Sequence, residues 1–103
     1  AHSAYIEEMV LEMMPWVSHA MVVGSRHPFL GLLLSLRLNP DMGGLLLGGE
    51  ALELARMCGS RATTVVTARP CPRFRHALAM SIAQVNALIP DPERKIRRFT
   101  VLL

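Results

Sequence analysis

The amino-acid sequence predicts a small α+β domain, in which three helices pack on a small, mainly antiparallel sheet. Two apolar stretches on either side of a group of turn residues predict a strand pair. Three other segments carry apolar residues at helical spacing, and a last apolar segment predicts a third strand. With 103 residues, the chain has the length of a single domain, residues 1–103, with a core of modest size.

The first helix is expected over residues 3–14. Ser3 is its predicted N-cap, since a serine hydroxyl can accept a hydrogen bond from an unpaired amide of the first turn. Pro15 ends the helix, because a proline steers the residue before it out of the helical region. The carboxylates are expected on a solvated face, which consists of Glu7, Glu8 and Glu12. The core-facing stripe consists of Ile6, Met9, Val10, Met13 and Met14.

A strand pair is expected next. Trp16–Val23 is mostly apolar on both faces, which is typical of a strand covered on both sides. Gly24–Pro28 has the composition of a turn, and Phe29–Leu38 is the following strand. Because the connection is short, the two strands are predicted to form an antiparallel hairpin. One face of the second strand is a row of leucines, namely Leu30, Leu32, Leu34, Leu36 and Leu38.

The middle of the chain is expected to hold a loop and a second helix. Residues 39–44 have the composition of a loop, and Leu45–Leu47 is ambiguous between glycines. The second helix is predicted over Glu50–Cys58, with Gly59 as its left-handed C-terminal cap. Ser60–Thr67 is either extended or a short turn into the next element. The apolar face of this helix consists of Ala51, Leu54, Ala55 and Cys58.

The strongest helical pattern covers Arg73–Ile89. Pro70 and Pro72 interrupt the chain before it, and Pro90–Pro92 ends it. The last strand is expected over Arg94–Leu103. The apolar stripe of this third helix consists of Phe74, Ala77, Leu78, Ser81, Ile82, Val85 and Leu88.

Composition restricts the class of protein. A formal charge of +3 and an apolar fraction of 51% permit an acidic partner without requiring one. Cys58 and Cys71 are too few for a disulfide framework and fit a reduced intracellular compartment. Residues 1–14 carry acids where a secretory signal needs basic residues. The longest uncharged apolar run, Pro28–Leu36, is far below the roughly 20 residues of a membrane span. We therefore expect a cytoplasmic protein.

The sequence lacks the spacings of known catalytic, cofactor-binding and metal sites. The glycine pairs at positions 43–44 and 48–49 lack the Lys and Ser or Thr of a phosphate-binding loop, so a surface loop is expected. Cys71 and His76 have no second ligand pair nearby, and no G-x-S-x-G elbow occurs. We therefore assign no catalytic, no cofactor-binding and no metal-ligating residue. The four histidines without metal-ligand spacing are His2, His19, His27 and His76.

Three other features have structural interpretations. His19 is expected to be a hydrogen-bonded sheet residue. Cys58 is expected to be an inert packed thiol on a helix face. The basic run Arg94–Arg98 is split over the two faces of a strand. A solvated edge strand, in which charge prevents mispairing, is its main interpretation, and a phosphate contact is the alternative.

Several segments resemble one family in the correct order. Residues 16–38, W-V-S-H-A-M-V-V-G-S-R-H-P-F-L-G-L-L-L-S-L-R-L, are similar to the hairpin I-S-N-A-M-L-V-G-D-x-x-K-F-L-S-M-L-L-T-L-K of adenylate-forming ligases. A-L-A-M-S-I-A-Q-V-N is similar to their helix A-I-x-x-G-I-x-x-V-N. C-G-S-R-A-T-T-V is similar to the bubblegum branch, where G-S-x-A-S/T-T-V follows the second helix. The chain thus resembles the C-terminal small-domain portion of bubblegum-type long-chain fatty-acid–CoA ligases.

The resemblance implies part of a mobile C-terminal lid that stops before the hairpin with the family's catalytic lysine. Lys95 lies before that hairpin and is no substitute, so this segment is not expected to catalyse alone. The full-length enzyme would use ATP, Mg²⁺ and CoA to activate a long-chain fatty acid, and its N-terminal large domain would be the partner. Peripheral association with the endoplasmic reticulum membrane stays open, and no cofactor is expected on the segment itself.

The chain departs from the family at Pro70 and Pro72. A charged helical linker is usual there, and the prolines should shorten or break it. The alternative function is a non-catalytic interaction domain derived from the lid. A nucleic-acid binder is the weaker third interpretation, because only Phe99 accompanies the basic run as a stacking residue. No nucleic-acid partner is therefore expected.

Overall fold

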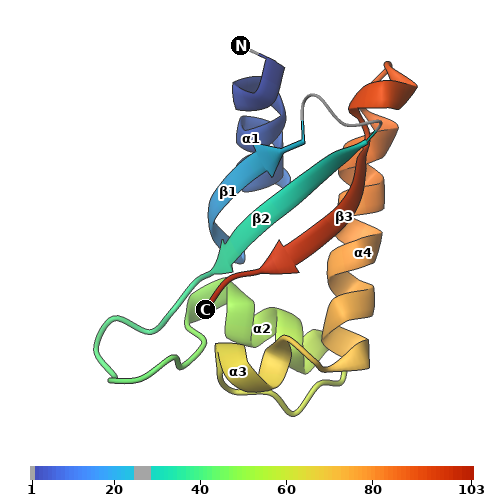
Figure 1. Ribbon diagram of the computed structural model, residues 1–103. Helices are drawn as coiled ribbons and strands as arrows, with labels where there is room; N and C mark the ends of the chain where they lie inside the picture. The colour runs from blue at the N-terminus through green and yellow to red at the C-terminus, as the bar shows by residue number, and fades with distance from the viewer. Residues whose placement is uncertain (1, 25–28) are drawn as a thin grey trace.

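Local signals in the sequence set the bounds of most elements. The computed structural model describes residues 2–24 and 29–103, which Figure 1 shows as a twisted sheet with helices behind it and at one end. Pro72 and Pro92 are the first residues of α4 and η1, as expected from the fixed φ and missing amide of proline. The elements are α1 His2–Met13, β1 Val17–Val23, β2 Leu30–Leu36, α2 Gly49–Met57, α3 Val65–Ala68, α4 Pro72–Ala87, the 3₁₀ helix η1 Pro92–Arg94 and β3 Ile96–Val101.

The sheet is mixed, with strand order β1-β2-β3. β1 and β2 pair antiparallel, with Met21 opposite Leu33, so the predicted hairpin pairing is confirmed. β2 and β3 pair parallel, with Leu34 opposite Val101. The prediction of a mainly antiparallel sheet is therefore wrong. The pairing is parallel because the long connection, residues 37–95, returns the chain to the end of the sheet where β2 begins. The turn predicted at Gly24–Pro28 lies, beyond Gly24, outside the described residues.

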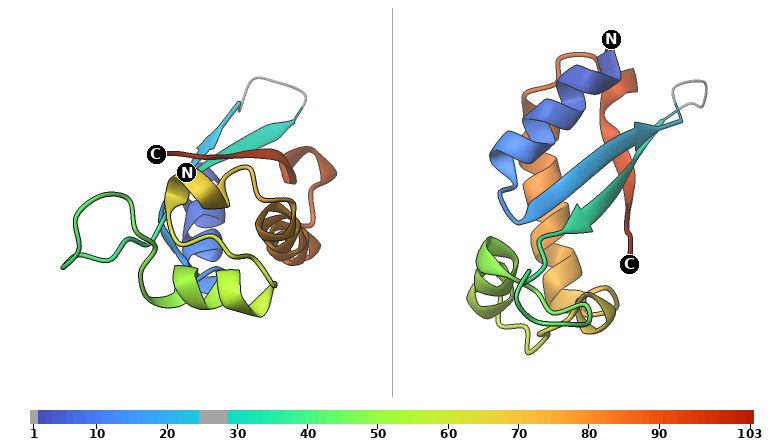
Figure 2. Two further views of the ribbon diagram at one scale, coloured as in Figure 1. Left: turned by 90° about the horizontal axis from the view of Figure 1, so that it is seen from below. Right: turned by 90° about the vertical axis from the view of Figure 1, so that its left-hand side faces the viewer.

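The core lies between the sheet and helices α1 and α4, which cover one face of it (Figure 2). The predicted leucine row of β2 is confirmed from Leu30 to Leu36, and Leu34 has no exposed surface. Leu38 is 42% exposed, contrary to prediction, because β2 ends at Leu36. Likewise Leu88 is 58% exposed and Ile89 is buried instead, because α4 ends at Ala87. The buried residues of α4 are Phe74, Leu78, Ile82 and Val85.

The second face of the sheet is open, which contradicts the prediction that the first strand is covered on both sides. Three β1 side chains, His19, Met21 and Val23, are exposed on this face. At the outer edge of β1, the amide of Val22 donates a 2.8 Å hydrogen bond to the carboxylate of Glu7 on α1. Glu7 is therefore a structural residue, and not part of the solvated face that was predicted for it.

The described residues form four α-helices, one more than predicted. The additional helix is α3, a single turn with a capping box in which Thr64 and Thr67 exchange side-chain and backbone hydrogen bonds. The break expected at the two prolines is confirmed, since α3 ends at Ala68 and α4 begins at Pro72. Gly59 has φ of 79°, which confirms its left-handed cap. Helix α1 already begins at His2, so the prediction of Ser3 as its N-cap is wrong.

Candidate functional site

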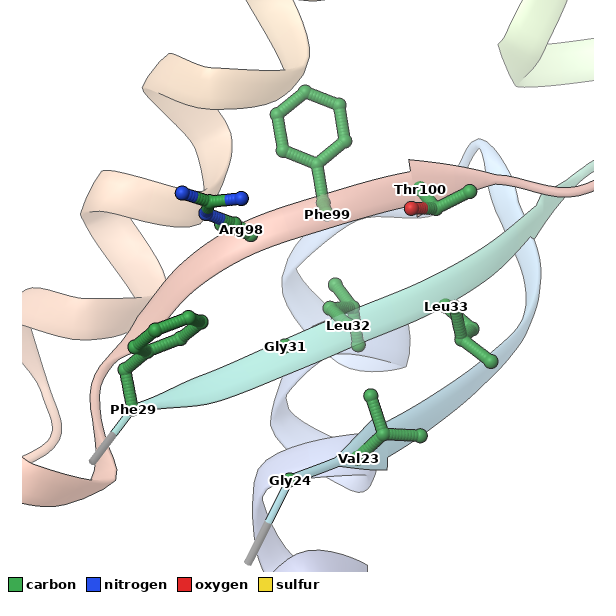
Figure 3. A pocket seen from close by; sticks show the side chains of 9 residues that line it. All are labelled: Val23, Gly24, Phe29, Gly31, Leu32, Leu33, Arg98, Phe99 and Thr100. Atoms are coloured by element: carbon green, nitrogen blue, oxygen red, sulfur yellow. The ribbon is translucent and has the colours of Figure 1, made fainter. Parts of the chain in front are cut away.

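The open face of the sheet contains a groove of about 430 Å³, which we call the sheet-face groove. Figure 3 shows its side chains around Gly31, with Val23 from β1 on one side and Arg98 from β3 on the other. The lining residues are Val23, Gly24, Phe29, Gly31, Leu32, Leu33, Arg98, Phe99 and Thr100.

Gly31 forms the centre of this groove. It pairs with Val23 on one neighbouring strand and with Arg98 on the other. A Cβ atom at this position would lie 3.3 Å from a methyl carbon of Val23, which is tighter than an ordinary contact. The missing side chain therefore leaves the hollow between two flanking rows of larger residues.

The electrostatics of the sheet-face groove come from Arg98. Its guanidinium lies 5.5 Å from the ring centroid of Phe29, within the range of a cation–π contact. Among residues 2–24 and 29–103, the lining includes no carboxylate, imidazole or thiol, and Thr100 supplies its one side-chain oxygen. A Mg²⁺ ion prefers carboxylate and water oxygens in octahedral geometry, so these residues do not fit the ion. The described lining is mostly apolar with one cationic side chain, which is the chemistry of a docking surface.

The basic run is dispersed in the structure. Nε of Arg94 lies 3.5 Å from Oδ2 of Asp91. Lys95 donates hydrogen bonds from Nζ to the carbonyl oxygens of Asn86 and Ile89, over 2.6 and 2.9 Å. A cation at these carbonyls stabilises the C-terminal end of α4, so Lys95 has a structural role. Arg97 and Arg98 are exposed on β3, which has no strand on its outer side in the part of the chain that the structure describes. The prediction of a solvated edge strand is confirmed for Arg97 and Arg98 and wrong for Arg94 and Lys95, because η1 ends at Arg94 and β3 begins only at Ile96.

The residues considered as metal ligands do not gather. His19 lies exposed on β1, and His76 is exposed on α4. The imidazole of His19 has no hydrogen-bond partner within residues 2–24 and 29–103, contrary to its predicted role. Within the same ranges, no three His, Cys, Asp or Glu side chains lie close enough to hold a metal ion.

Gly48 lies where two segments of the backbone pack closely against each other. A Cβ on this residue would lie 2.6 Å from the carbonyl carbon of Leu38 and 2.6 Å from the amide nitrogen of Asn39. Its amide donates to the carbonyl of Arg37 over 3.0 Å. The glycine thus permits two chain segments to approach each other at the start of α2. Gly43 and Gly44 lie in an exposed loop, as expected, whereas the surface loop predicted at positions 48–49 is wrong, because Gly48 is buried and Gly49 begins α2.

The sequence did not indicate a contact between Ser60 and Cys71. Cys71 is the N-cap residue of α4, and its Sγ lies 3.2 Å from Oγ of the buried Ser60. Ser60 Oγ also accepts a hydrogen bond from the amide of Ala62, which leaves its own proton for the sulfur. This hydrogen bond from Ser60 is the largest cause that lowers the pKa of Cys71. The backbone amides of Phe74 and Arg73 and the positive charge of Arg73 lower the pKa further, whereas burial of the thiol raises it.

In the sequence, Pro72 indicates that Cys71 lies at the start of a helix. A proline is favoured at the first position of a helix, so Cys71 before it is in the N-cap position, where backbone amides point at the side chain. The Ser60 contact, in contrast, depends on tertiary structure. Cys58 is partly buried and donates from Sγ to the carbonyl of Ala55 over 3.4 Å, as a packed thiol does.

Comparison with known proteins identifies relatives over nearly the whole chain. A Mus musculus protein named long-chain-fatty-acid–CoA ligase ACSBG2 is 45% identical over 104 residues. The Homo sapiens ligase ACSBG1 is 42% identical over 103 residues, and the Rattus norvegicus ligase ACSBG2 is 35% identical over 103 residues. Each alignment covers 94% of this chain, but the chain spans only 14–15% of the length of these relatives.

Two other comparisons gave no match. No protein-family model matches the chain, and no solved structure does. In the described part of the chain, no helix is both long enough and apolar enough to cross a membrane.

Proposed function

Because the chain is a relative of the bubblegum-type long-chain-fatty-acid–CoA ligases and matches one segment of them, we propose that it forms part of the C-terminal lid of such an enzyme. In this proposal, residues 1–103 are one domain, which does not catalyse the reaction alone. The observation that carries the proposal is the alignment of 94% of the chain, at 45% identity, with about 15% of a named ligase.

In this proposal, the rest of the enzyme carries out the chemistry. A long-chain fatty acid would be activated with ATP and Mg²⁺ and transferred to CoA, and the large domain would hold these groups. The described residues of this chain include no cluster of carboxylates, histidines or thiols that fits a metal ion. The lid would contribute by changing its pose between the two half-reactions, as mobile domains do in many enzymes.

We place the contact with the large domain on the sheet-face groove. Helices α1 and α4 cover the opposite face of the sheet, so this face remains for a partner. Its exposed side chains include apolar ones, since Met21 is 57% exposed and Val23 and Phe29 are each 37% exposed. Apolar surface of this kind, with a polar rim that includes Arg98 and Thr100, is typical of an interface between domains.

A chimera tests this proposal directly. The matching segment of the Mus musculus ligase would be replaced by this chain, and adenylate formation and acyl-CoA formation would be measured separately. We expect both half-reactions in the chimera and neither in the isolated chain. The matched control is the same chimera with Leu34→Asp, which destroys the core and should lose both. A soluble, folded chimera that performs neither half-reaction would contradict the proposal.

An interaction domain derived from the lid is the second candidate. The outer edge of β3 beyond Ile96 favours it, because a free edge can pair with another chain. Under this alternative, the chimera is inactive while the isolated chain folds and binds a partner. The two proposals therefore give opposite results in the same pair of experiments.

A further inference from the structure

The outer edge of β3 is covered at its start and free further along. Asn86 on α4 pairs with Ile96 as a strand would: Nδ2 donates to the Ile96 carbonyl, and Oδ1 accepts from the Ile96 amide. The amide of Leu102 donates to Leu34, so it faces β2. Because successive backbone groups of a strand face opposite edges, those of Phe99 and Val101 face outward. They receive no side-chain hydrogen bond from the described part of the chain.

A groove of about 410 Å³ runs beside this free edge, and we call it the edge groove. One wall is β3 itself, from Phe99 to Val101, and the other comes from the junction of α3 and α4. Figure 3 shows the Phe99 ring projecting from β3 away from β2. The opposite wall includes Val66, which is 57% exposed, and Pro70. The groove thus offers unpaired peptide groups on one side and apolar side chains on the other.

Two arginines of the edge groove give it a positive charge. Arg75 lies with its guanidinium 4.8 Å from the Phe99 ring centroid and donates to the carbonyl of Arg69 over 3.4 Å. Arg69 is the second arginine of the lining, and no carboxylate belongs to it. Among the described residues, neither arginine lies within 4.0 Å of a carboxylate, whereas Arg37 and Arg94 each have one. The charge of these two arginines is therefore free for a partner.

We propose that the edge groove binds an extended, acidic segment of a partner protein, which adds a strand to β3 beside Phe99–Val101. Main-chain hydrogen bonds would supply affinity, and carboxylates facing Arg69 and Arg75 would supply selectivity, as in other cases of strand addition. This inference does not depend on the proposed role in a ligase.

The same charges argue against a second copy of this chain as the occupant. Pairing two β3 edges across a two-fold axis would bring Arg69, Arg75 and Arg97 of both copies together. Like charges at such an interface disfavour the wrong partner. A polyanion would satisfy the arginines, but it has no peptide groups for Phe99 and Val101, so the free strand edge favours a peptide.

The test uses the 103-residue chain and a fluorescent, end-blocked peptide of alternating glutamate and valine. Binding is followed by fluorescence anisotropy, and the amide signals of Phe99 and Val101 are followed by NMR. We expect saturable binding that shifts both signals and weakens with salt. The double variant Arg69→Gln, Arg75→Gln should bind about fivefold more weakly. The matched control, Arg56→Gln with Arg61→Gln, changes the net charge equally on exposed residues outside the groove lining and should bind normally.

A second peptide separates strand pairing from general charge attraction. Methyl groups on alternate backbone nitrogens leave its charge unchanged but remove the donors needed for pairing, and its affinity should fall by about tenfold or more. Equal binding of the methylated peptide would overturn the proposal, as would equal weakening by both double variants. No binding of either peptide, dimerisation through β3, or a preference for polyphosphate over the peptide would also overturn it.

Discussion

The side chain of Asn86 binds both backbone groups of Ile96, donating from Nδ2 to the carbonyl over 2.8 Å and accepting at Oδ1 from the amide over 2.7 Å. Helix α4 is thereby attached to the first residue of β3. Lys95, one residue earlier, donates to two carbonyls at the end of the same helix. Four hydrogen bonds therefore fix the point where the chain enters its last strand.

Asn86→Leu should lower the free energy of unfolding by about 1–3 kcal/mol, since it leaves two partly buried backbone groups without partners. Urea denaturation followed by circular dichroism measures the change. Gln84→Leu, at an exposed position of the same helix, is the control and should lie within about 0.5 kcal/mol of the parent. Similar values for the two variants would show that the Asn86 contacts add little.

Leu34→Asp should prevent folding of the domain. Leu34 has no exposed surface and lies in the middle strand between its two neighbours. An unpaired carboxylate at this place has no compensating partner, and its burial costs several kcal/mol. Met21→Asp, on the open face, is the matched control because Met21 is 57% exposed. A circular-dichroism melt of Leu34→Asp that matches the parent would rule out the core described above.

Gly48→Ala should destabilise the domain by roughly 1–3 kcal/mol, whereas Gly43→Ala should have almost no effect. A methyl group at position 48 would meet backbone atoms of Leu38 and Asn39 at 2.6 Å, and backbone cannot move aside as a side chain can. At position 43 nothing lies within 4 Å of the added carbon. Thermal unfolding of both variants measures the difference, and equal melting temperatures would disprove the close approach.

The Cys71 thiol should react with iodoacetamide at a lower pH than an ordinary thiol, whose pKa is 9.0. The Ser60 hydrogen bond is the largest cause of the lowered pKa, so Ser60→Ala should move the midpoint of the pH–rate profile upward. Measurements in a Cys58→Ser background isolate this thiol. An unchanged midpoint in Ser60→Ala would show that the hydroxyl does not stabilise the thiolate.

The same lowered pKa links stability to pH. Because the thiolate is favoured in the folded chain, its contribution is fully present above the pKa of the unfolded thiol and is lost as the pH falls through the lower, folded pKa. The parent should therefore gain more stability than Cys71→Ser as the pH rises toward 9.0. Denaturant midpoints of both proteins across this range provide the measurement.

Features that depend on local sequence were predictable, and those that depend on distant partners were not. The alternation of Leu30 to Leu36 specified a strand with one buried face, and Pro72 specified the start of a helix. The same alternation contains no information on the direction of the third strand, so the parallel pairing was missed. Glu7 looked like a solvated carboxylate because its partner, the Val22 amide, lies on another element.

The candidate site also combines features that local sequence predicts with features that depend on distant residues. Gly31 could be seen in the sequence as a small residue within a strand, but the groove around it requires the neighbours that pairing supplies. Arg69 and Arg75 come together with Phe99 because α3 and α4 meet beside the end of the sheet. The basic run at positions 94–98 is the densest group of charges in the sequence. Its members nevertheless serve different purposes, of which the cap formed by Lys95 is the clearest.

The parallel pairing of β2 with β3 has a consequence for the order of folding. The hairpin β1–β2 needs only neighbouring residues, but β3 cannot join until residues 37–95 have closed a long loop. Closing such a loop loses chain entropy before any contact compensates for it, and contacts distant in sequence slow folding. We therefore expect β3 to dock late, after α4 has packed. During synthesis, the hairpin would emerge from the ribosome with one edge of β2 still bare.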